Sequence, residues 1–167
     1  MRRMTRWLRS MLRLREDKEA KSHMNKPIHT TNCFDTFIRV AEDCPARSGE
    51  EPPPRAGQPT VAALQYAMIT KAPYKYTSDD VIFATSAPGR ELDARATKAE
   101  KSAARAAFFS RGQACMRASS LGKRFGWGVH ADSEGRIAIY AVDSKRYQAL
   151  SSDPKLTQVR AMRSKRG

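Results

Sequence analysis

The stretch SSLGKRFGWGVHADSEGRIAIY, residues 119–140, decides the fold predicted for this chain. Two β-like runs, GWGVH and RIAIY, lie on either side of ADSEG, whose aspartate, serine and glycine are residues that tight turns favour. The stretch therefore predicts a β-hairpin. In the second run Ile137 and Ile139 alternate with Ala138 and Tyr140, so both faces are apolar and we expect this strand to be central in a sheet.

The sequence on either side of the hairpin predicts further strands, helices and loops. β-branched and aromatic residues predict strands over residues 34–40, 81–85 and 157–162. Periodicity and capping residues predict helices that begin after Thr60, after Asp93 (an alanine-rich helix) and after Asp143 or Ser144. Proline and glycine at residues 88–89 predict a turn, and the five prolines of residues 45–59 predict an extended, exposed loop.

The order of these elements is strand, helix, strand, helix, hairpin, helix and strand. The connections are short, and a chain of 167 residues suits one domain better than two. We therefore expect a single α+β domain over residues 24–167, with a largely antiparallel sheet, helices packed on one face and a basic C-terminal tail.

Residues 1–23 differ in character from the rest of the chain. Arginines interleave with apolar residues such as Trp7 and Leu8, which at helical pitch predicts a basic amphipathic extension. Three interpretations stay open: a helix that lies on a membrane surface, a targeting segment, or sequence upstream of a true start at Met24. The abrupt change at Met24 favours the last, in which the extension is disordered or not part of the native product.

The chain is strongly basic, with a formal net charge of +14. Residues 1–23 carry +5 of this and the remaining residues carry +9. Such a balance is typical of proteins that contact nucleic acid, anionic lipid or acidic partners. Arginine outnumbers lysine by 20 to 11, however, which a GC-rich genome produces without selection for binding, so the charge favours a nucleic-acid partner only weakly.

Several protein classes are excluded by what the sequence lacks. No run of about 18 apolar residues exists, which excludes a transmembrane helix. The three cysteines form no C-x-x-C pair and are odd in number, unlike a secreted disulfide framework, so we expect a reducing, cytoplasmic location. No P-loop, dinucleotide fingerprint, nucleophile elbow or zinc-ligand spacing occurs.

Four blocks carry a resemblance to a known family. They are HTTNCFDTFIRVAEDCP (29–45), LQYAMITKAPYKYTSDDVIF (64–83), GQACMRASSLGKRFGWGVHADSEGRIAIY (112–140) and VRAMRSKR (159–166). In this order they resemble an uncharacterised family of short single-domain proteins, a domain of unknown function. The resemblance covers about residues 29–166 and implies no activity and no catalytic residue.

Basic and aromatic residues around the hairpin indicate a nucleic-acid surface. Arg117, Lys123 and Arg124 lie close in sequence to Phe125 and Trp127, and single-strand binding needs cations for phosphates and rings for bases. The alternative is that both rings anchor the hairpin in the core and the cations form its solvated rim.

The same stretch also suits a pocket for a small anionic ligand. Gly126 and Gly128 allow another group to approach the backbone on either side of Trp127. His130 and Tyr140, with Arg124, supply the few polar groups that such pockets use. The alternative is that the glycines merely relieve crowding in a twisted sheet.

The case for catalysis or a metal is weaker. Cys115 lies between basic residues, but no spacing brings a histidine to it, and His130, Asp132 and Glu134 alternate only as far as the predicted turn. We expect no metal, cofactor or assigned catalytic residue. The sequence favours a small binding module of unknown function, monomeric or dimeric, with a site around residues 124–130; a single-strand nucleic-acid binder and an unrecognised enzyme are the alternatives.

Overall fold

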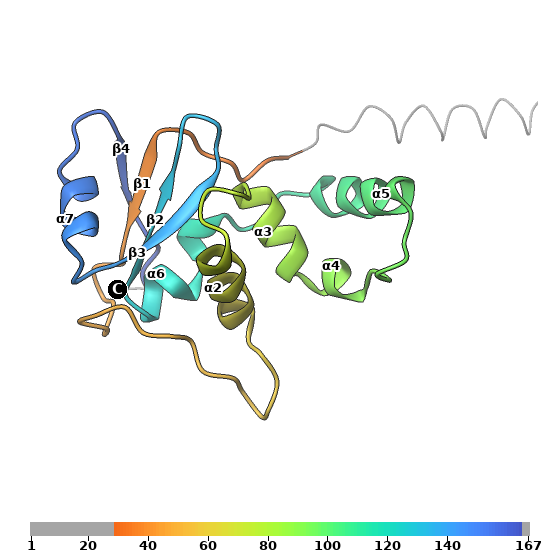
Figure 1. Ribbon diagram of the computed structural model, residues 1–167, viewed down its shortest axis with the longest axis horizontal. Helices are drawn as coiled ribbons and strands as arrows, with labels where there is room; N and C mark the ends of the chain where they lie inside the picture. Colours follow the sequence, from red (N-terminus) through yellow and green to blue (C-terminus); the bar gives the residue numbers. More distant parts are fainter. Residues whose placement is uncertain (1–28, 165–167) are drawn as a thin grey trace, which may run out of the picture.

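The computed structural model describes residues 29–164, which form a single α+β domain around one four-stranded sheet (Figure 1). The strands are β1 (Thr36–Arg39), β2 (Trp127–Ala131), β3 (Ile137–Ala141) and β4 (Thr157–Arg160). The helices are α2 (Val61–Lys71), α3 (Ser78–Thr85), α4 (Ala87–Glu91), α5 (Lys98–Phe109), the 3-10 turn η1 (Met116–Ala118), α6 (Ser120–Arg124) and α7 (Lys145–Ser151). The extension of residues 1–23 and the last three residues of the tail lie outside the described residues.

The predicted hairpin is confirmed. β2 and β3 pair antiparallel with Val129 opposite Ile139, and the Asp132 carboxylate accepts the backbone N–H groups of Glu134 and Arg136 to close the turn. Gly135 completes this turn with a φ of 75°. Turn geometry thus accounts for Asp132.

The expectation of a largely antiparallel sheet is confirmed, since two of the three strand pairings are antiparallel and the third is parallel. β1 pairs antiparallel with β2 but parallel with β4, in the order β3-β2-β1-β4. Parallel pairing needs a crossover, and the chain between β3 and β4 makes one through α7.

The expectation that the second hairpin strand is central is wrong, since β3 lies at the edge. Its outer edge is covered by a loop: Tyr74 N–H donates to the carbonyl of Ile137 (2.9 Å), and Ile137 N–H donates to that of Tyr76 (2.8 Å). The loop thus supplies hydrogen bonds to the start of this edge strand, at Ile137.

Helices cover both faces of the sheet, so the expectation of one covered face is also wrong. α2 and α6 lie on one face, where Ile38, Leu121 and Val129 belong to the larger core cluster. On the other face α7 packs Tyr147 and Leu150 against Phe37. The adjacent residues Phe37 and Ile38 of β1 therefore pack in the core clusters on opposite faces of the sheet, as expected because successive side chains of a strand alternate between its faces.

The arm formed by α3, α4 and α5 departs most from expectation. Residues 81–85 are helical and not a strand, because Thr77 and Asp80 form a reciprocal capping box that starts α3. Residues 88–89 lie in the first turn of α4, where proline is tolerated, and are not a free turn. Thr97, not Asp93, caps the alanine-rich helix α5.

The proline-rich loop of residues 45–59 is confirmed as a loop, but it is not wholly exposed. Its first half crosses the start of the hairpin: Glu50 N–H donates to the carbonyl of Phe125 (2.9 Å), and Pro52 is buried. Gly126, with a φ of 73°, lies directly beneath this crossing. In the part of the chain that the structure describes, no helix is long and apolar enough to span a membrane.

Candidate functional site

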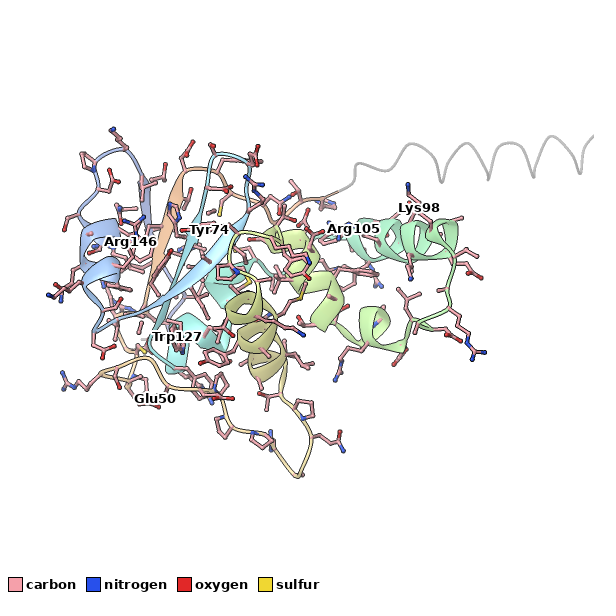
Figure 2. All side chains as sticks on the ribbon, in the orientation of Figure 1. Glu50, Tyr74, Lys98, Arg105, Trp127 and Arg146 are labelled. Atoms are coloured by element: carbon pink, nitrogen blue, oxygen red, sulfur yellow. The ribbon has the colours of Figure 1, made fainter. Side chains whose placement is uncertain are left out.

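The structure places the predicted hairpin residues on opposite faces of the sheet. Trp127 belongs to the α2 face, where its ring contacts Tyr66 and its indole N–H donates to the carbonyl of Glu50 at 2.8 Å (Figure 2). His130 lies on the α7 face together with Tyr140. The fold therefore brings His130 and Tyr140 together but separates both from Trp127.

The three predicted basic residues lie near the end of the sheet where β4 finishes. Arg117, in η1, donates through Nε to the carbonyl of Arg160 at 2.9 Å, and its own carbonyl accepts the N–H of Met162. Lys123 is half-buried and Arg124 exposed at the end of α6. The described residues carry 20 Lys and Arg against 14 Asp and Glu, a net +6, so more than half of the net charge lies outside them.

A tyrosine–histidine network occupies the α7 face beside β3. The Tyr74 hydroxyl lies 2.7 Å from His130 Nδ1 and 3.0 Å from the Tyr140 hydroxyl. If Tyr140 donates to Tyr74 and Tyr74 donates to Nδ1, both contacts are satisfied and Nε2 of the imidazole carries the proton. Tyr74 has a φ of 57°, so its backbone adopts the left-handed region that brings the hydroxyl there.

The surroundings of Tyr74 and His130 keep these two side chains neutral. Burial lowers the pKa of His130, and the Arg146 guanidinium adds to this effect, while Asp132, Asp35 and Asp153 act in the opposite direction. Burial and the Tyr140 hydrogen bond raise the pKa of Tyr74. The network therefore does not provide a reactive phenolate. Its hydrogen bonds instead connect β2 and β3 to the loop before α3.

The depressed pKa of His130 makes stability depend on pH. The unfolded imidazole, with an ordinary pKa of 6.5, binds a proton more readily than the folded one, so the free energy of unfolding should fall as pH drops below about 6.5. His130→Asn, which keeps an acceptor for Tyr74, should flatten this slope. Urea denaturation between about pH 7.5 and pH 5.5 measures it; equal slopes in both proteins would contradict the assignment.

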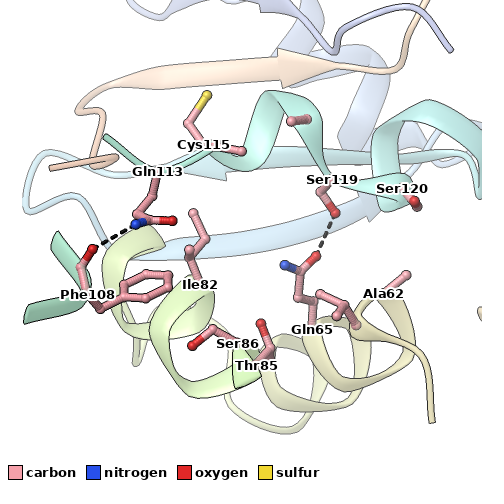
Figure 3. Close-up of a pocket in the computed structure, with 13 residues that line it drawn as sticks. Ala62, Gln65, Ile82, Thr85, Ser86, Phe108, Gln113, Cys115, Ser119 and Ser120 are labelled. Carbon is pink, nitrogen blue, oxygen red and sulfur yellow. Dashed lines mark hydrogen bonds between the residues drawn. The ribbon is translucent and has the colours of Figure 1, made fainter. Parts of the chain in front are cut away.

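A polar hollow on the opposite side of the sheet is better suited to hold a ligand (Figure 3). It has a volume of about 360 Å³ and lies between α2, α3, the end of α5 and residues 113–120. Its apolar wall includes Val61, Ile82 and Phe108. Small-molecule sites combine such a wall with a few convergent polar groups.

Gln65 supplies the most telling of these polar groups. It is buried on α2, and the Ser119 hydroxyl donates to its Oε1 at 2.6 Å. Ser119 Oγ also accepts the N–H of Leu121, so its one hydroxyl hydrogen is directed to Oε1. The Nε2 group points away from Ser119 into the hollow and has no acceptor among the described residues.

Other polar groups of the hollow complement Gln65. The Gln113 amide donates to the carbonyl of Phe108 at 2.7 Å, so its Oε1 remains an acceptor, and the Ser120 hydroxyl has no hydrogen bond within the described part of the chain. Cys115 also lines the wall, and no charged residue does. The hollow therefore offers donors and acceptors without a formal charge.

Sequence reasoning did not find this hollow. Gln65 stands at a buried position of the α2 apolar stripe, and that polar exception was the signal that could have pointed to it. The remaining walls come from segments about 20 and 50 residues away along the chain, which no motif links. Among residues 29–164 no group of three or more His, Cys, Asp or Glu is arranged to hold a metal ion.

The fold and the hollow define a small α+β domain with a mixed sheet and a polar, uncharged cavity beside it. Residues 28–167 match the model of a family described as "Family of unknown function (DUF6157)", and the chain belongs to this family. No curated protein and no solved structure matches the chain. The resemblance seen in the four sequence blocks is thereby confirmed.

Proposed function

We propose that the protein is a binding module for a small uncharged molecule that carries a carbonyl or amide group next to an apolar part. The observation that carries this proposal is the buried Gln65 amide, whose Oε1 is held by Ser119 while Nε2 faces the hollow. Nε2 has no acceptor among the described residues, so the carbonyl of a ligand that displaces solvent from the hollow would accept a hydrogen bond from it. The apolar wall at Ile82 and Phe108 would take the rest of the molecule.

The absence of charge in the wall supports an uncharged ligand. An ion moved from water into such a hollow would lose hydration without gaining an opposite charge. Cys115 lines the hollow, but neither His29 nor His130 does, so the lining provides no imidazole to activate this thiol. The proposal is therefore a binding function. We infer a cytoplasmic location as well, which the three unpaired cysteines support.

Benzamide and benzoate are a matched pair of probes for this site. We expect benzamide to shift the Gln65 side-chain amide signals saturably in NMR titrations, with a dissociation constant on the order of millimolar for so small a molecule. Benzoate should bind more weakly because its carboxylate meets no cation. Ala114→Trp, at an exposed position of the rim, should block the hollow and abolish the benzamide shift.

The matched control is Gln148→Leu, which removes an exposed amide on α7, on the other face of the sheet. This variant should bind benzamide like the wild type, whereas Gln65→Leu should not. Benzamide shifts that survive Ala114→Trp, or tighter binding of benzoate than of benzamide, would contradict the proposal.

A further inference from the structure

Two arginines meet at the end of the sheet where β1 and β4 finish side by side. We propose that Arg39 and Arg160 form a binding site for the phosphoryl group of a small molecule. This site is separate from the uncharged hollow, and it concerns a ligand of opposite character.

The register of the two strands brings the arginines together. In the parallel pair of β1 and β4, Arg39 is the direct partner of Arg160. Neighbouring strands lie roughly 4.8 Å apart and paired residues point to the same face. That face is the one covered by α7, because Arg39 follows Phe37 by two residues. Two like charges are thus held next to each other by the backbone.

Arg39 has no partner in the described part of the chain. The residue is half-buried, and its Nε is fully buried without a hydrogen bond. Its terminal nitrogens form no hydrogen bond or ion pair with residues 29–164 either, although guanidinium groups that leave water normally find acceptors. An unpaired cation beside a second cation is an arrangement that an anion would stabilise.

The nearby carboxylates form no ion pair with Arg39. Glu42 forms an ion pair with Arg163 and lies 3.8 Å from the Nε of Arg160, so one carboxylate is shared by two arginines. Asp43 accepts the backbone N–H of Ser164 at 2.8 Å. Neither carboxylate pairs with Arg39, and Arg160 is 46% exposed, so its guanidinium remains open to a ligand from solvent.

Tyr147 supplies a third donor at the same place. Its hydroxyl oxygen accepts the N–H of Val40 at 3.1 Å, and the hydroxyl hydrogen has no acceptor within residues 29–164. Burial raises the pKa of Tyr147, while Arg39 and Arg160 act in the opposite direction, as expected for cations near the phenol. The hydroxyl therefore stays protonated and can donate.

The donor set selects the chemistry of the ligand. Two planar guanidinium forks and one hydroxyl match the tetrahedral oxygens of a phosphoryl group, which can accept several charge-assisted hydrogen bonds at once. An anion also offsets the positive charge of Arg39 and Arg160, of which Glu42 compensates only a part. The Tyr147 ring packs against Phe37 and is therefore not free to stack on a base.

Pyrophosphate and inorganic phosphate are the probes for this site, used on the full chain at constant ionic strength. We expect pyrophosphate to shift the Arg39 Nε–H signal saturably and to bind more tightly than phosphate. Arg39→Gln should weaken pyrophosphate binding by about tenfold or more. Arg160→Gln, at a more exposed position, should weaken it similarly and serves as the second variant if Arg39→Gln fails to fold.

Arg55→Gln is the matched control, since it removes the same charge from an exposed turn of the proline-rich loop. It should leave pyrophosphate binding unchanged. An equal loss in Arg55→Gln and Arg160→Gln would show a diffuse charge effect and overturn the site. Binding of a thymidine oligonucleotide without saturable binding of pyrophosphate would also overturn it, in favour of a nucleic-acid surface.

Discussion

Gly126→Ala should lower the free energy of unfolding by about 3 kcal/mol, of which about 1 kcal/mol comes from the left-handed backbone and the rest from steric conflict and lost hydrogen bonds. Gly126 has a φ of 73°, and a Cβ there would lie 2.2 Å from the carbonyl oxygen of Ser48. Because this oxygen is a backbone atom and cannot rotate away as a side chain can, the proline-rich loop would have to move away from the hairpin. The bonds from Glu50 to Phe125 and from Trp127 to Glu50 would then break.

Gly57→Ala is the control for this prediction. Gly57 has the same φ of 73°, but nothing lies within 4 Å of the position of its Cβ. Gly57→Ala should therefore lower the free energy of unfolding by only about 1 kcal/mol, which is the cost of the left-handed backbone conformation alone. Urea denaturation followed by tryptophan fluorescence measures both variants. Equal destabilisation by the two substitutions would mean that the loop does not press on the hairpin.

Asp79→Ala should destabilise the protein by about 3 kcal/mol, because hydrogen bonds to a buried charged acceptor are among the stronger ones. Asp79 is only 7% exposed, and its carboxylate accepts the Thr30 hydroxyl at 2.8 Å and both the N–H and the hydroxyl of Thr31 at 2.7 Å. Its own N–H donates to Asn32. These contacts tie the segment before β1 to the start of α3, and alanine would leave the donors of Thr31 buried and unpaired.

Asp80→Ala is the matched control at the next position. The Asp80 side chain is 38% exposed, caps Thr77 and pairs with Arg105 at 3.0 Å. Its loss should cost about 1 kcal/mol, as for other exposed helix caps. Hydrogen exchange of the Thr31 amide should rise in Asp79→Ala and stay low in Asp80→Ala. If Asp80→Ala lowered the free energy of unfolding more than Asp79→Ala, the stabilising role of the hydrogen bonds between Thr31 and Asp79 would be refuted.

The elements that sequence predicted correctly are those whose signals are local. The turn at Asp132 and Gly135 closes between strands that are neighbours in the chain, and Thr60 and Ser144 cap helices that follow them directly. Residues 81–85 were wrongly predicted as a strand because β-branched and aromatic residues also occur in a buried helix. The capping box that begins at Thr77 is the local sequence signal that correctly indicates a helix, α3, in this segment.

The two sites proposed here depend on contacts between distant segments. Gln65 reaches Ser119 across 54 positions, and Arg39 meets Arg160 only because β4 returns parallel to β1. In the sequence, Gln65 is one residue in an apolar helix and Arg39 is one arginine among 20. Neither the free amide nor the unpaired guanidinium can be recognised until the surrounding donors and acceptors have been placed.

Sequence alone determined the α+β class, the family, the hairpin and the helix caps at Thr60 and Ser144, because short-range periodicity and capping hydrogen bonds do not depend on the rest of the fold. Tertiary structure alone decided that β4 pairs parallel to β1, that both faces of the sheet are covered, and that Trp127 and His130 lie on opposite sides of it. The physical reason is that strand order and site composition follow from which apolar faces pack together, and that choice is made by the whole chain.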